Sequence, residues 1–125
     1  MPKVKYTKAK GLFQESGNVE QMALLGTAGS IAAAGSSQSD ATEITTIVAI
    51  VSGADATKGV ILPEGVDGAI HVVVNTAAAA LKIYPASGEK IEGGSANAAV
   101  TTGNNEVGMY IYTGATRGWQ SIVSA

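Results

Sequence analysis

The sequence contains no cysteine, which excludes disulfide bonds, thiolate nucleophiles and zinc–cysteine sites. It contains one histidine, His71, so one chain cannot build a metal centre from several histidines. No apolar run approaches the ~20 residues of a membrane-spanning helix. The N-terminal lysines are not followed by the apolar segment of a secretory signal. We therefore expect a protein that folds in a cytosol and is stabilised by burial, backbone pairing or assembly.

Large side chains are also scarce, because 21 residues are alanine, 16 are glycine and aromatic residues make up only 5% of the chain. Among the larger apolar residues, 12 valines and 10 isoleucines stand against five leucines. Branching at Cβ suits the pleated surface of a sheet better than a helix. A chain of 125 residues is long enough for one domain with one core.

Short apolar runs separated by turn residues follow residue 43. This spacing, without a convincing helix between the runs, predicts an all-β fold: an antiparallel β-sandwich or jelly-roll of about 7–8 strands. We place the sandwich domain at residues 44–125. The expected strands are residues 44–51, 59–62, 70–74, 80–84, 90–91, 98–101, 107–113 and 119–123.

Residues 1–43 are rich in Gly, Ala, Ser, Gln and Lys, with only scattered large apolar residues. We predict that they form an extended N-terminal arm and linker. Residues 26–30 and 35–40 have the composition of loops. The alternative is that this region supplies a first strand or two of the domain.

Charge separates the beginning of the chain from the rest. The first ten residues carry four lysines and no acid, whereas the other 115 carry four basic and ten acidic side chains. This division suggests that the basic beginning and the acidic remainder of the chain have different functions. We expect the arm to bind another protein through its charges and its apolar residues. Nucleic-acid binding by the arm is the alternative, although an acidic body opposes a phosphate backbone. The predicted arm residues are Lys3, Lys5, Tyr6, Lys8, Lys10, Leu12 and Phe13.

Catalytic motifs are not supported by the pattern of polar residues. Glu89 and Glu92 lie in an expected turn, as do Glu64 and Asp67, and turns are where soluble proteins usually carry acids. The glycine-rich stretch 88–94 lacks the phosphate-loop pattern and a following helix. We therefore predict no enzyme activity, no cofactor, no metal and no small-molecule substrate.

The segment around residues 70–74 is apolar on both of its faces, which indicates that each face is covered by protein. We predict that Ile70, His71 and Val73 lie at a subunit interface. For His71, packing in the core or at that interface is the expected role. A metal shared by three copies on a symmetry axis is the remaining alternative.

A larger pattern resembles small structural proteins of tailed bacteriophages. It combines Leu62-Pro63, a strand ending in Asn75, the stretch Tyr84-Pro85-Ala86-Ser87-Gly88 with Ile91, an Ala-Asn-Ala turn at 96–98, and an aromatic-rich end at 110–113 and Gly118-Trp119. The resemblance covers about residues 57–120 and is to head decoration (cement) proteins.

This resemblance implies a β-sandwich or jelly-roll that forms a homotrimer and binds the major capsid protein on the exterior of the virion. It implies no catalytic residues. Similar modules also occur in tail and fibre proteins, so recognition of a host surface or glycan is the alternative function.

Overall fold

The structure is a computed structural model in which residues 3–8, 11–16 and 28–124 are described. Within these ranges the chain forms strands, bridges and turns but no helix, and the predicted all-β class is confirmed. No helix among the described residues is long and apolar enough to cross a membrane. The strands are β1 (Lys3–Thr7), β2 (Gly11–Ser16), β3 (Ala28–Ala32), β4 (Thr42–Glu43), β5 (Val48–Ser52), β6 (Gly59–Ile61), β7 (Ile70–Asn75), β8 (Leu81–Tyr84), β9 (Val100–Thr102), β10 (Val107–Tyr112) and β11 (Trp119–Val123).

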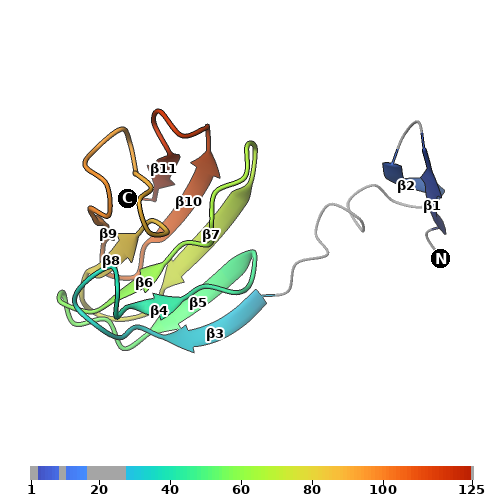
Figure 1. The fold of residues 1–125 in the computed structure, drawn as a ribbon. Helices are drawn as coiled ribbons and strands as arrows, with labels where there is room; N and C mark the ends of the chain where they lie inside the picture. Colours follow the sequence, from blue (N-terminus) through green and yellow to red (C-terminus); the bar gives the residue numbers. More distant parts are fainter. Residues whose placement is uncertain (1–2, 9–10, 17–27, 125) are drawn as a thin grey trace.

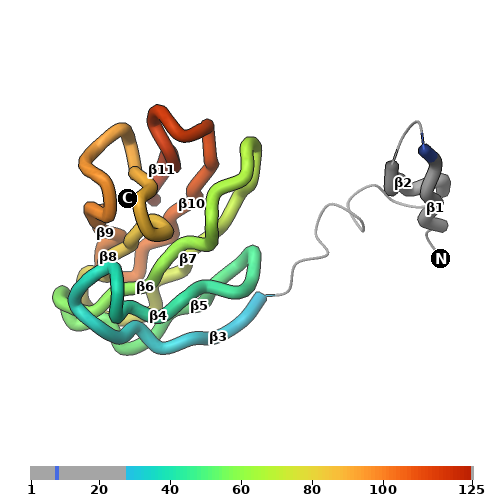
Figure 2. The backbone as a smooth tube through the Cα atoms, in the orientation of Figure 1, coloured from blue at the N-terminus to red at the C-terminus, as the bar shows by residue number. Residues whose placement is uncertain are grey.

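Nine of the described strands make two sheets, which we call the body (Figure 1). The five-stranded sheet has the order β11-β10-β7-β5-β3, and the four-stranded sheet has the order β4-β6-β8-β9. Figure 2 lets the eye follow the backbone as it passes between the two sheets. One cluster of buried apolar side chains contains residues of both sheets, so the sheets pack over a shared core.

Both sheets are mixed, so the prediction of an antiparallel sandwich is wrong in this respect. β3, β5 and β7 pair in parallel in one sheet, and β4, β6 and β8 pair in parallel in the other. A parallel pair needs a crossover between its strands, usually made by a helix. Here the chain alternates between the sheets from β3 to β8, so each crossover is itself a strand of the opposite sheet. The antiparallel pairs come later, with β9, β10 and β11.

Residues 28–43, which we assigned to the arm, contribute β3 and β4 to the two sheets, as the alternative proposed. The boundary at residue 43 therefore falls inside the sheet-forming region. β3 has the sequence Ala-Gly-Ser-Ile-Ala and no strong strand propensity of its own. It forms through backbone pairing with β5, a tertiary interaction that composition does not reveal.

The expected strands after residue 43 mostly lie where they were predicted. Residues 44–47 precede β5 instead of belonging to it, and the short run at 90–91 contributes only a bridge between Ile91 and Trp119. Gly118, just before β11, has a φ of 71°, and a Cβ there would lie 1.9 Å from the carbonyl oxygen of Lys90. Only glycine permits this close approach of two backbones.

The core is filled by alternate residues of the strands. Ala49, Val51, Val73 and Tyr110 of the five-stranded sheet are completely buried. The buried hydroxyl groups of Tyr110 and Thr102 lie 2.8 Å apart and form a hydrogen bond that joins the two sheets. The polar groups inside the core are thereby partnered, as burial requires.

The buried Tyr110 predicts a loss of stability in alkaline solution. Burial raises the pKa of Tyr110 from 10.0 to about 12. The pKa of Tyr110 is higher in the folded state than in the unfolded state, so the protonated phenol stabilises the fold. This stabilisation is complete below pH 10 and is lost as the pH rises towards 12. We expect it to amount to about 3 kcal/mol.

Urea unfolding across that pH range measures this effect. The control is Tyr110→Phe combined with Thr102→Val, which removes the phenol without leaving the threonine hydroxyl unpaired. Equal alkaline losses in the native chain and the double variant would contradict the assignment to Tyr110.

β1 and β2 form a third, two-stranded antiparallel sheet, which we call the hairpin. Neither of its strands pairs with a strand of the body. The predicted extended arm therefore contains regular backbone pairing over Lys3–Thr7 and Gly11–Ser16. An isolated hairpin is at best marginally stable in water, so this element needs a surface to pack against.

Candidate functional site

The most distinctive surface is the side of the five-stranded sheet that faces away from the core. On β7, Val73 and Asn75 are buried while Ile70, Val72 and Val74 keep some exposure, so the two sets point to opposite sides. The same alternation holds on β5 and β10. We call the resulting surface the outer face. It comprises Val48, Ile50, Ile70, Val72, Val74, Val107, Met109, Ile111 and Ile122.

The strand register makes the outer face continuous. Val72 lies between Val48 on β5 and Met109 on β10, and Met109 in turn lies opposite Ile122 on β11. Directly opposite residues in a sheet place their side chains together on one face. One apolar surface therefore extends across four neighbouring strands.

Several of these side chains are well exposed. The exposed fraction is 47% for Ile70, 39% for Met109 and 66% for Ile122. Soluble sheets that face water usually alternate apolar residues inside with polar residues outside. A contiguous exposed apolar patch of this kind typically marks a site of protein–protein contact.

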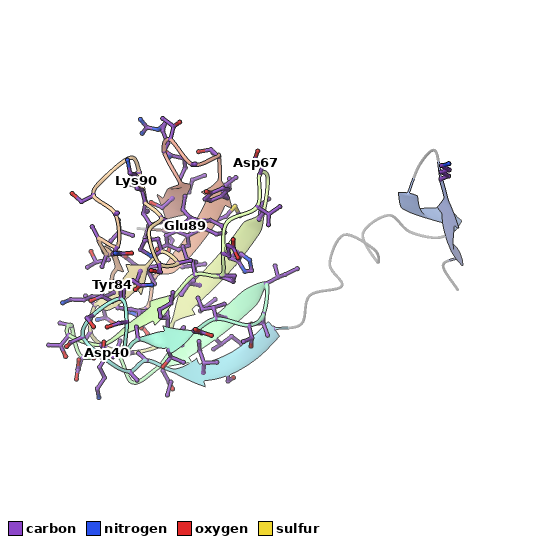
Figure 3. The ribbon with its side chains drawn as sticks, viewed as in Figure 1. Asp40, Asp67, Tyr84, Glu89 and Lys90 are labelled. Atoms are coloured by element: carbon purple, nitrogen blue, oxygen red, sulfur yellow. The ribbon has the colours of Figure 1, made fainter. Side chains whose placement is uncertain are left out.

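Charged residues are absent from this sheet: none of the five strands contains Asp, Glu, Lys or Arg. The charged side chains of the body lie in its loops and in the four-stranded sheet, as Asp40 and Asp67 illustrate in Figure 3. The outer face therefore offers no charge to recognise phosphate, and its chemistry fits an apolar protein surface.

The three predicted interface residues have different surroundings. Ile70 belongs to the outer face and is available for contact. Val73 is completely buried in the core, so its assignment to a subunit interface is wrong. It is one residue along from Val72, and a shift of one residue reverses the face of a strand.

His71 is half-buried on the core side of β7. Its Nδ1 lies 3.1 Å from the carbonyl oxygen of Thr46, and its ring meets Trp119 edge-on with centroids 5.7 Å apart. These contacts describe a packing histidine that does not reach the outer face. Among the described residues, no three potential metal ligands gather into a group.

Glu89 makes hydrogen bonds to two segments that flank or belong to the five-stranded sheet. Its carboxylate accepts hydrogen bonds from the backbone N–H of Gly65 at 2.7 Å and from Trp119 Nε1 at 3.1 Å. It thus links the loop before β7 to the first residue of β11. Glu89 is labelled in Figure 3. Sequence reasoning assigns Glu89 only the role of a turn acid, because neither of its hydrogen-bond partners is near it in the chain.

The predicted arm residues lie mainly in the hairpin. Lys3, Lys5 and Tyr6 are on β1, and Leu12 and Phe13 are on β2. For these five the structure describes only the backbone. Lys8 is exposed in the turn between the strands, and Lys10 lies outside the described residues.

A second surface feature is an open hollow of about 630 Å³ beside the four-stranded sheet. Its lining carries hydroxyl, amide and amino groups, and Tyr84 donates a hydrogen bond to the carbonyl oxygen of Ser36 at its wall. Its polar lining residues include Ser37, Gln38, Lys82, Tyr84, Asn97 and Thr101.

Comparisons with known proteins do not assign the chain to a family. No family model matches the sequence, and no curated protein matches it. One solved structure that resembles it is a chaperone–substrate complex, with 18% sequence identity and a TM-score of 0.41. That alignment covers 98% of this chain and 20% of the other, so this chain spans about a fifth of that protein's length. A similarity at this level carries no argument about fold or function.

Proposed function

We propose that the protein is a structural component of a bacteriophage virion that binds the exterior of the assembled capsid and stabilises it as a trimeric decoration protein. Its partners are the major capsid protein and further copies of itself. It acts by binding and performs no chemical reaction.

The observation that carries this proposal is the uncharged outer face. A surface of nine apolar side chains across β5, β7, β10 and β11 suits contact with protein. The resemblance of residues 57–120 to decoration proteins supports the phage capsid as the assembly that this surface serves. The two-layer body supports the jelly-roll relationship at the level of layers, while its parallel pairs depart from the antiparallel Greek-key pattern.

The mechanism follows from linkage. A protein that binds only the assembled, expanded shell adds its binding free energy to the stability of that shell. A trimer attaches at several points, so contacts that are weak singly combine into firm attachment. The lysine-rich beginning of the chain steers the encounter with an acidic surface.

The alternative is a tail or fibre module that recognises a host surface or glycan. The hollow lined by Lys82, Tyr84, Asn97 and Thr101 favours this alternative, because hydroxyl, amide and amino groups hydrogen-bond sugars. Purified protein would then bind host cells and leave shells bare.

Imaging tests the proposal directly. Purified protein is mixed with undecorated expanded heads of the phage that encodes it, and the heads are viewed by electron cryomicroscopy. We expect regular added density on the outer surface and a higher disassembly temperature. Bare heads at saturating protein concentration would overturn the proposal.

Charge reversal in the hairpin region should slow this attachment. We expect replacement of Lys3, Lys5, Lys8 and Lys10 by glutamate to lower the association rate by about tenfold, more at low salt, because unscreened charge steers the encounter. The matched control reverses the four basic residues of the body, which changes the net charge equally. Equal slowing in both variants would assign the effect to net charge alone. The control residues are Lys58, Lys82, Lys90 and Arg117.

A further inference from the structure

The outer face and the hairpin each lack a partner within the described structure. The outer face exposes Ile70, Met109 and Ile122 to solvent, and the hairpin pairs with no strand of the body. A two-stranded sheet gains stability when it packs against an apolar surface, and the outer face is such a surface.

The register of the hairpin divides its residues between two faces. Tyr6 lies opposite Leu12, and Val4 lies opposite Gln14, so these four positions share one face. The pair formed by Lys5 and Phe13 occupies the other face. One face of the hairpin therefore combines three apolar residue types with an uncharged amide. This matches the uncharged chemistry of the outer face.

The dimensions also agree. β1 and β2 contain five and six residues, and β7 and β10, at the centre of the outer face, contain six each. Hairpin and outer face are thus matched in length, at roughly 17–20 Å.

The connection between hairpin and body allows the hairpin to reach another molecule. Eleven residues, 17–27, separate β2 from β3, and β3 is an edge strand of the five-stranded sheet. A chain of eleven residues spans at most about 36–40 Å. Crossing the five-stranded sheet takes only about 19 Å, so the connection is long enough to extend beyond its own body.

We propose that the hairpin of one copy packs through its Val4–Tyr6–Leu12 face on the outer face of a second copy of this chain. Each molecule then gives one hairpin and receives one. Such a head-to-tail contact repeats from copy to copy until it closes into a ring. The opposite face of the hairpin, with Lys5, stays available for other contacts. The inference concerns the protein by itself and does not require a capsid.

Electrostatics favours this contact over others between copies. Residues 28–124 carry eight acids and four bases, so two bodies repel each other. The segment from Lys3 to Lys10 is basic, so a hairpin is attracted to the body of its neighbour. Contact through the uncharged outer face also leaves no charge buried without a partner.

Two full-length variants test the proposal. Met109→Glu places a charge on the outer face and leaves the hairpin intact, while Leu12→Glu does the reverse. The matched controls are Thr101→Glu, at an exposed position of the four-stranded sheet, and Thr7→Glu, at a hairpin position in register with Gly11. Sedimentation velocity over a range of micromolar concentrations measures association, and circular dichroism verifies folding.

We expect the native chain and both controls to self-associate, and each test variant to associate at least tenfold more weakly. Mixing the two variants should produce a one-to-one complex, because Met109→Glu contributes an unaltered hairpin and Leu12→Glu contributes an unaltered outer face. If Leu12→Glu associates like the native chain, or if the mixture forms no complex, the proposal is wrong. A native chain that stays monomeric also overturns it. Heads that stay bare would overturn the proposed function and leave this result unaffected.

Discussion

Replacement of Trp119 by alanine is expected to destabilise the protein by about 3–5 kcal/mol, the range for deleting a large buried aromatic residue. Trp119 is completely buried and meets the ring of Tyr112 edge-on at 5.3 Å, as well as that of His71. Its loss leaves a cavity where the first residue of β11 joins the core. A small domain has a total stability of only about 5–15 kcal/mol, so this loss is large.

The indole N–H adds a second contribution. It donates to Glu89, whose other carboxylate oxygen holds the N–H of Gly65, so alanine also removes a donor from a carboxylate. Urea unfolding of Trp119→Ala is compared with that of Trp119→Phe, since phenylalanine keeps an aromatic ring and much of the volume but cannot donate a hydrogen bond to Glu89. A loss below about 1 kcal/mol for Trp119→Ala would show that the core closes over the cavity.

Replacement of Asn75 by alanine is expected to cost about 3 kcal/mol, because it removes several buried hydrogen bonds at once. Asn75 Nδ2 donates to the carbonyl oxygens of Ala79 and Gly103, both at 2.8 Å. Its Oδ1 accepts from the N–H of Ala77 at 3.0 Å. One side chain thus fixes the turn after β7 and ties it to the end of β9.

The neighbouring Thr76 provides a control. Its exposed side chain makes one hydrogen bond, from Oγ1 to the carbonyl oxygen of Val51 at 2.9 Å. We expect Thr76→Ala to cost about 1 kcal/mol or less. Chemical denaturation of both variants measures the difference. Equal losses would mean that water replaces the partners of Asn75.

Part of the candidate site was visible in the sequence. The run 107–112 places Val107, Met109 and Ile111 on one side and Tyr110 and Tyr112 on the other. Period-2 alternation assigns these residues to two faces, and apolar residues on both faces indicate that both faces are covered. Neither the partners of this strand nor the side it turns to the core follows from the pattern, because alternation is symmetric.

The assignment of Ile70, His71 and Val73 to one interface shows this limit. In a strand, Ile70 and Val73 point to opposite sides, and only the packing of the four-stranded sheet shows which side is inside. The sequence also does not reveal that one apolar surface joins Val48, Val72, Met109 and Ile122. This surface depends on the register between strands that are far apart in the chain.

The sequence by itself determined the all-β class and the positions of most strands after residue 43, because β-branched runs and turn residues act locally. It also determined that the beginning of the chain is basic and the rest acidic. Tertiary structure decided the strand partners, the parallel pairing and the recruitment of β3 and β4. Backbone hydrogen bonds are the same for every residue type, so a weakly patterned segment such as Ala28–Ala32 becomes a strand only when a neighbour such as β5 offers its edge.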